Sequence, residues 1–151
     1  MAVSDQDKIV DIMKQTSLHA YLATCEGDQP MVRPVSPIVE HCTSIWVATS
    51  AGSRKIKQIR KNPKVSLAFV ELPHGEKAAT VIGEAVEVDD LGEKRRVWSS
   101  ARFDLSEHFP DGPESPDFAL LRIKVEKIEW RDRWEGGLKV YEPDRDSPHR
   151  D

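Results

Sequence analysis

The segment best suited to bind an anion is residues 49–55, with the sequence Thr-Ser-Ala-Gly-Ser-Arg-Lys. Ser53 precedes a run with helical periodicity, and the start of a helix presents unpaired backbone N–H groups and the positive end of the helix dipole. Thr49 and Ser53 offer hydroxyl donors, and Gly52 allows an anion to approach the backbone. Arg54 and Lys55 add full charges on the first turn. Because such cations are unfavourable for the helix itself by up to about 1 kcal/mol each, the pattern predicts a bound phosphate monoester.

Two other interpretations of this basic segment stay open from the residues alone. A capped surface helix with solvated lysines has the same pattern. Residues 53–64 also hold six basic residues and no acidic one, which is typical of a nucleic-acid contact. However, the whole chain has a net charge of −4, and the segment contains no aromatic side chain on which a base could stack. We therefore expect no nucleic-acid partner.

Arg33 is a second candidate for the same site. It stands in an otherwise apolar extended run, between Val32 and Pro34. A single arginine in a strand is usually exposed, or it extends from a half-buried face. If the fold brings this strand beside Thr49, Arg33 becomes a third cation on the same anion.

Metal binding and nucleophilic catalysis have no support in the sequence. The five histidines do not occur at ligand spacing with one another or with cysteine, so we expect no metal site. Cys25 and Cys42 are too few for a disulfide framework and are predicted to be buried or half-buried thiols. Neither a G-x-S-x-G nucleophile motif nor a Walker-type phosphate loop is present.

The elements that must position these residues are short strands with a few helices. Pro34 and Pro37 cannot donate ladder hydrogen bonds, so their strand should be bent or lie at an edge. Gly83, within a strand, predicts a bend or a close backbone approach. Six strands at short spacing predict a mainly β, mostly antiparallel barrel with helical decoration. The expected strands are 19–25, 30–39, 45–49, 65–70, 78–88 and 120–130, and the expected helices are 5–15, 54–62 and 91–101.

Length and composition fit one folded domain. The chain has 151 residues, of which 38% are hydrophobic and 32% charged. We expect one domain over residues 1–141 and a disordered charged tail over 142–151. No apolar run approaches the roughly 18 residues that cross a bilayer, and the first residues are acidic, unlike a signal peptide. These features predict a soluble, cytoplasmic protein without a membrane partner.

Several motifs together carry a resemblance to a known family: Arg-Pro-Val-Ser-Pro at 33–37, Ile-Trp-Val-Ala-Thr at 45–49, Gly-Ser-Arg-Lys at 52–55, Gln-Ile at 58–59, Asn-Pro-Lys-Val-Ser-Leu at 62–67 and Val-Ile-Gly-Glu-Ala at 81–85. In order and spacing they resemble the FMN-binding split barrels related to pyridoxamine 5′-phosphate oxidase, especially the short general-stress-protein-like members. The resemblance covers roughly residues 15–130. It implies a six-stranded antiparallel split β-barrel that forms a homodimer with FMN at the subunit interface.

The resemblance also implies which residues bind the cofactor. The phosphate of FMN would be held by Arg33, Ser53, Arg54 and Lys55. The isoalloxazine ring and ribityl chain would be lined by Val35, Ser36, Ala48 and Thr49.

Three departures from the family pattern count against vitamin B6 oxidase activity. Ile38 stands where the oxidase has a lysine, and Ala78 stands where a flavin-contacting glutamine is expected. The C-terminal Arg-x-His substrate motif is missing. The sequence therefore favours an FMN-dependent oxidoreductase with an unidentified small-molecule substrate. The alternative is a non-catalytic protein that binds or carries a flavin, a deazaflavin or haem.

Overall fold

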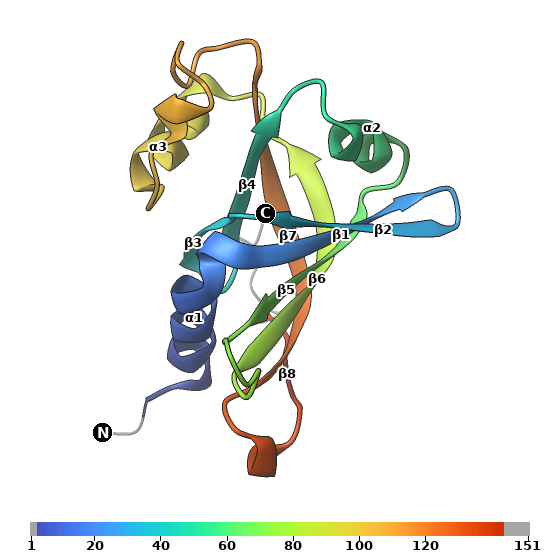
Figure 1. Ribbon diagram of the computed structural model, residues 1–151, viewed down its shortest axis with the longest axis vertical. Helices are drawn as coiled ribbons and strands as arrows, with labels where there is room; N and C mark the ends of the chain where they lie inside the picture. Colours follow the sequence, from blue (N-terminus) through green and yellow to red (C-terminus); the bar gives the residue numbers. More distant parts are fainter. Residues whose placement is uncertain (1–2, 144–151) are drawn as a thin grey trace.

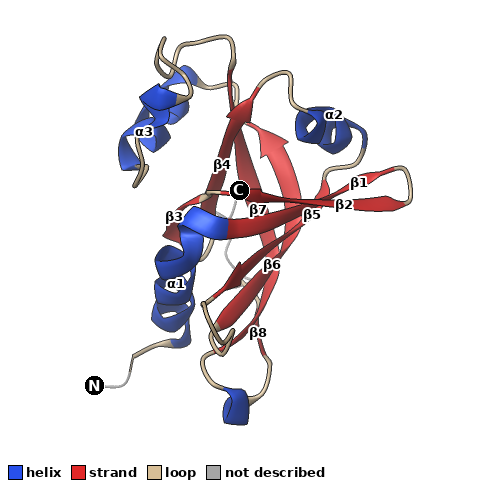
Figure 2. Cartoon of the chain, in the orientation of Figure 1, coloured by secondary structure: helices blue, strands red, loops and turns tan. Residues whose placement is uncertain are grey.

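In the computed structural model, which describes residues 3–143, eight strands form one antiparallel sheet accompanied by three α-helices (Figures 1 and 2). The strands are β1 (Ala20–Glu26), β2 (Gln29–Val35), β3 (Ile38–His41), β4 (Ser44–Ser50), β5 (Lys64–Val70), β6 (Ala78–Glu87), β7 (Phe118–Arg131) and β8 (Lys139–Tyr141). The helices are α1 (Asp5–Thr16), α2 (Arg54–Lys61) and α3 (Leu91–Ser100), with short 3₁₀ turns η1 (Ser17–His19), η2 (Leu105–Glu107) and η3 (Trp134–Gly136).

The sheet curls into a split barrel. Its hydrogen-bonded strand order is β2-β1-β5-β6-β7-β4-β3, with β8 paired to β7. β2 and β3 are therefore the two edges of this path, yet only Ser36 and Pro37 separate them along the chain. The sheet must curl until its edges come near each other, although no ladder joins them in the described residues. The predicted mainly β antiparallel split barrel with short helices is confirmed.

The strand count differs from the expected six. The run predicted as one strand over 30–39 is interrupted at Ser36 and Pro37, so it becomes β2 and β3. A proline without an N–H group cannot continue the ladder there. The three-residue β8, which the sequence did not indicate, pairs with Ile128–Trp130 on the long strand β7.

The main hydrophobic core fills the barrel and the space under α1. Alternate residues of β5 and β6 point into it, among them Leu67, Phe69 and Val81. α1 contributes Ile9 and Met13, and it packs on β3, β5 and β6. Ser4 caps this helix, because its hydroxyl accepts a hydrogen bond from the backbone N–H of Asp7.

A second hydrophobic cluster holds α3 and the following loop against β4 and β7. It contains Trp46, Leu120 and Phe118 from the sheet and Val97, Leu105 and Phe109 from α3 and its loop. Trp98, Phe109 and Phe118 add edge-to-face ring contacts. This cluster holds α3 at the same end of the barrel as α2, opposite η3 (Figure 1).

The cysteines, the described helices and the acidic side chains bear on other features considered in the sequence. Cys25 is half-buried and Cys42 is buried, both as free thiols, as predicted. None of the described helices is long and apolar enough to cross a membrane. Over residues 3–143, no group of three or more histidine, cysteine, aspartate or glutamate side chains could hold a metal ion. From residue 144 onward, the tail predicted to be disordered lies outside the described residues.

Candidate functional site

The junction between β4 and α2 joins three of the predicted phosphate-binding residues to Thr49. Ser53 occupies the N-cap position of α2, but its hydroxyl makes no cap bond to the first turn. Instead, Thr49 Oγ1 donates to Ser53 Oγ at 3.3 Å, and Lys55 Nζ donates to Thr49 Oγ1 at 2.6 Å. Ser53 therefore does not cap the helix with its side chain, although it directly precedes the first turn, because its oxygen faces Thr49 rather than the helix amides. Arg54, the first residue of α2, is exposed.

Arg33 reaches the same helix from the sheet edge. β2 lies beside β1, on which α2 packs, so the Arg33 side chain extends along β1 towards α2. Arg33 Nη1 donates to the carbonyl oxygen of Leu22 at 3.1 Å and to Thr24 Oγ1 at 2.8 Å, and Nη2 donates to Gln58 Oε1 at 2.8 Å. The sequence did not predict that Gln58 would be part of this arrangement.

Arg33, Arg54 and Lys55 form what we call the cation cluster. Burial, followed by the charge of Arg54, lowers the pKa of Arg33. Burial, followed by the charge of Arg33, lowers the pKa of Lys55. The three side chains are therefore close enough to repel one another, and none forms an ion pair with a described carboxylate. Such uncompensated charge at a half-buried position favours binding of an anion.

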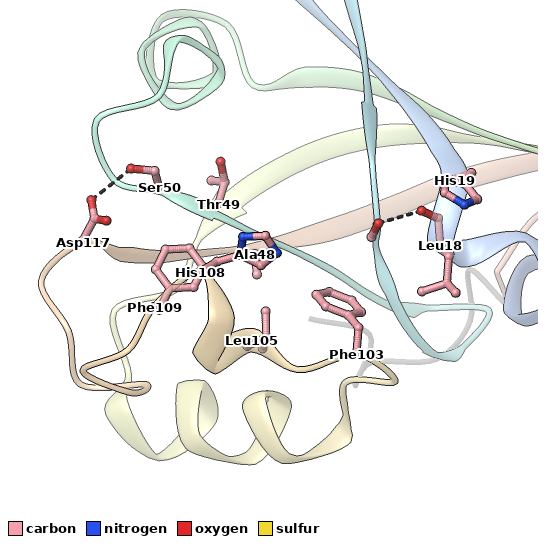
Figure 3. A pocket seen from close by; sticks show the side chains of 11 residues that line it. Leu18, His19, Ala48, Thr49, Ser50, Phe103, Leu105, His108, Phe109 and Asp117 are labelled. Carbon is pink, nitrogen blue, oxygen red and sulfur yellow. Dashed lines mark hydrogen bonds between the residues drawn. The ribbon is translucent and has the colours of Figure 1, made fainter.

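A cavity of about 630 Å³ opens beside the cation cluster (Figure 3). Side chains from the loop after α3 lie on the same side of β4 as the side chain of Ala48, whereas the side chain of Thr49 extends to the other side (Figure 3). Thr49 both lines the cavity and accepts the hydrogen bond from Lys55. The charged end and the largely apolar end of the candidate site thus meet at one residue, Thr49.

The structure brings most of the predicted site residues together. Ser36, Ala48 and Thr49 line the cavity, and Arg33, Ser53, Arg54 and Lys55 lie at or beside the cation cluster. Val35 packs against the main core and does not line the cavity.

Much of the cavity wall comes from residues that the sequence analysis did not select: Leu18, His19, Ser50, Phe103, Leu105, His108, Phe109 and Asp117. Five of them belong to the loop between α3 and β7. The signal in the sequence was the apolar spacing of Phe103, Leu105 and Phe109 within an otherwise polar stretch. Asp117 fixes the far end of this loop, because its carboxylate accepts from Ser50 Oγ at 2.9 Å and its carbonyl from the amide of Ala51 at 2.8 Å.

Comparison with known proteins places this architecture in a family. The sequence profile described as pyridoxamine 5′-phosphate oxidase matches residues 6–131. The chain belongs to this family. The match includes both edges of the split barrel, the cation cluster and the cavity wall. None of the curated proteins matches the chain in sequence.

Solved structures of the pyridoxamine 5′-phosphate oxidase fold superpose along most of the chain. General stress protein 26 of Bacillus anthracis has a TM-score of 0.73 at 24% identity, over 90% of this chain and 96% of that one. A heme binding protein of Mycobacterium smegmatis has a TM-score of 0.70 at 16% identity, over 94% and 60%. PhzG of Burkholderia lata, in complex with tetrahydrophenazine-1-carboxylic acid, has a TM-score of 0.65 at 16% identity, over 91% and 83%. At these identities the likeness shows the fold, while the ligands differ between relatives.

Proposed function

We propose that this chain is an FMN-binding oxidoreductase that acts on a small molecule other than pyridoxamine 5′-phosphate. The observation that carries the proposal is the continuity of the cation cluster with the cavity at Thr49. FMN has the same layout, with a dianionic phosphate at one end and a planar, largely apolar ring system at the other. One ligand of this kind would compensate the mutually repelling charges and fill the cavity.

The residues present fit the phosphate of FMN. Arg33 uses three of its five N–H donors within the protein, and the other two have no partner among residues 3–143. Lys55 retains further donors beyond the one on Thr49, and the guanidinium of Arg54 is exposed. Charge-assisted bonds from these groups to phosphate oxygens are about twice as strong as bonds between neutral groups.

The cavity fits the remainder of the cofactor. Its volume of about 630 Å³ falls in the usual range for small-molecule sites. In this proposal Ser36, Ala48 and Thr49 contact the ribityl chain and ring, and Val35 contributes through its backbone. Bound flavin would supply two-electron transfer, while the chain's own residues bind, orient and shield it.

Vitamin B6 oxidase activity is not part of the proposal. Ile38, at the position where the resemblance leads us to expect a lysine, is buried in the second hydrophobic cluster. No cation is therefore offered from that position to a substrate phosphate. We therefore propose a different small molecule as the substrate.

We further propose a homodimer, and the family resemblance implies that FMN lies at its subunit interface. Tyr21 and Val32 lie on the same outer face of the β1–β2 pair and are 50% and 68% exposed. Arg33 is on the opposite face of this pair, so an apolar surface lies directly behind the cation cluster. A second copy would cover that surface.

The test is flavin binding by purified protein and by the double variant Arg54→Ala/Lys55→Ala. We expect yellow protein that quenches FMN fluorescence saturably and sediments as a dimer. Losing two charged phosphate contacts should weaken FMN binding by roughly 3 kcal/mol or more. Binding of riboflavin, which lacks the phosphate, should barely change.

The matched control is Lys57→Ala/Lys61→Ala, which removes the same charge from exposed positions on the same helix. It should leave FMN affinity within a few-fold of the wild type. Colourless protein with no saturable flavin binding would overturn the proposal, and equal losses in the two double variants would relocate the phosphate.

A non-catalytic carrier is the second candidate. His19 and His108 both line the cavity, and one structural relative is described as heme binding. The absorption spectrum of the purified protein separates the candidates, because haem, FMN and deazaflavin have distinct bands. Turnover of a reduced nicotinamide or of oxygen by flavin-loaded protein separates an enzyme from a carrier.

A further inference from the structure

The guanidinium of Arg33 is held by neutral groups only. Its three acceptors are the carbonyl oxygen of Leu22, the hydroxyl of Thr24 and the amide oxygen of Gln58. Thr24 and Gln58 are 2% and 6% exposed, and Thr24 Oγ1 donates to Gln58 Oε1 at 2.5 Å. Because both Arg33 and Thr24 donate to it, the side-chain oxygen of Gln58 must face the arginine.

A carboxylate is nearby but does not pair with Arg33. Glu26 Oε2 accepts a hydrogen bond from Gln58 Nε2 at 3.3 Å, so the glutamine stands between the acid and the arginine. An arginine kept only for folding would be paired most simply with a carboxylate. Here the carboxylate of Glu26 accepts from the amide nitrogen of Gln58, on the side of the amide away from Arg33, and the positive charge of Arg33 is not cancelled.

We infer that Gln58, together with Thr24, is a positioning residue of the anion site: it fixes the Arg33 guanidinium through neutral acceptors and leaves its full charge for the ligand. The inference rests on the proposed function, since the anion is taken to be the phosphate of FMN. It adds two buried residues of β1 and α2 to a site otherwise made of exposed and half-buried groups.

The test is Gln58→Glu, which keeps the size of the side chain and the oxygen that accepts from Arg33. It replaces the amide nitrogen that donates to Glu26 with a second oxygen, so Arg33 is paired with a carboxylate. Affinities for FMN and riboflavin are measured by fluorescence quenching. We expect the dissociation constant of FMN to rise roughly tenfold or more, since a charged contact is lost, while that of riboflavin stays unchanged. A purely structural residue would move both constants together.

Two further variants separate position from net charge. The double variant Glu26→Gln/Gln58→Glu exchanges the two residue types, so the carboxylate stands at position 58. The exchange keeps the net charge and avoids the repulsion between two neighbouring carboxylates. It should lose FMN affinity as selectively as Gln58→Glu, and it serves as the test if the single variant does not fold. Gln29→Glu, the same change at an exposed position of β2, should alter neither constant.

The outcomes distinguish the two proposals. One outcome is that the wild-type protein binds FMN and that both variants carrying Gln58→Glu keep the wild-type ratio of FMN to riboflavin affinity. This outcome would overturn the inference and leave the proposed function standing. Equal losses for the two flavins would make Gln58 a structural residue and also overturn the inference. Wild-type protein that binds neither flavin would overturn the proposed function and the inference with it.

Discussion

Two glycines differ sharply in what a methyl group would meet. A Cβ atom on Gly83 would lie 2.0 Å from the backbone oxygen of Lys124, at the bulge where β6 and β7 change register. Gly83→Ala should therefore force the strands apart and lower the free energy of unfolding by about 1–3 kcal/mol, the usual cost of overpacking. Urea unfolding measures the change.

Gly52→Ala is the control for that prediction. A Cβ atom on Gly52 would meet nothing within 4 Å. Stability should be unchanged or slightly raised, because alanine restricts the unfolded chain. An equal loss of stability in the two variants would contradict the close approach at Gly83. If Gly52→Ala also weakens FMN binding, the phosphate approaches the backbone there.

From the sequence, the charged residues of the candidate site could be predicted better than the buried residues that hold them in place. Arg54 and Lys55 were recognisable because cations at the start of a helix interact unfavourably with its dipole unless an anion binds there. Gln58 was not, because a glutamine between Ile56 and Ile59 gives no sign of facing an arginine 25 residues away. That contact depends on β1, β2 and α2 coming together, which no local pattern encodes.

At the level of elements, the loop between α3 and β7 forms one side of the cavity. Leu105 anchors it by packing into the second hydrophobic cluster, and it also lines the cavity. Leu105→Ala should lower the free energy of unfolding by about 2–5 kcal/mol and loosen the wall. FMN and riboflavin affinities should fall together, because the ring loses its contacts while the phosphate keeps its own.

Glu107→Ala, at an exposed position of the same turn, is the matched control for the loop and should change neither affinity. Thermal unfolding and fluorescence quenching measure the two effects in each variant. A loss confined to FMN in Leu105→Ala would place the ring outside this cavity.

The sequence predicted most elements because their periods and end signals are local. The alternation in β6 and the Asn-Pro stop after α2 need no tertiary information. The division of 30–39 into β2 and β3 was only half predicted, as a bend at prolines. It requires the chain to leave one sheet edge and join the other, which depends on closure of the whole sheet.

For the whole molecule, the distribution of charge gives opposite salt effects on folding and on binding. The chain has a net charge of −4, yet the cation cluster concentrates positive charge. Burial, followed by this neighbouring charge, lowers the pKa values of Arg33 and Lys55. Salt screens such repulsion over a Debye length of about 10 Å at 0.1 M. Added salt should therefore relieve the cluster in the free protein and weaken its attraction for a phosphate.

The prediction is measured as the rise in melting temperature that saturating FMN causes at about 0.02 M and 0.5 M sodium chloride. A ligand at 100 times its dissociation constant adds about 2.7 kcal/mol of stability, which is roughly 5–10 °C for a domain of this size. That rise should shrink at high salt because FMN affinity falls. In Arg54→Ala/Lys55→Ala the rise should be smaller and nearly independent of salt. An FMN-induced rise that is the same at both salt concentrations in the wild type would mean that the cation cluster does not bind the phosphate, and that the uncompensated charge at the start of α2 has another purpose.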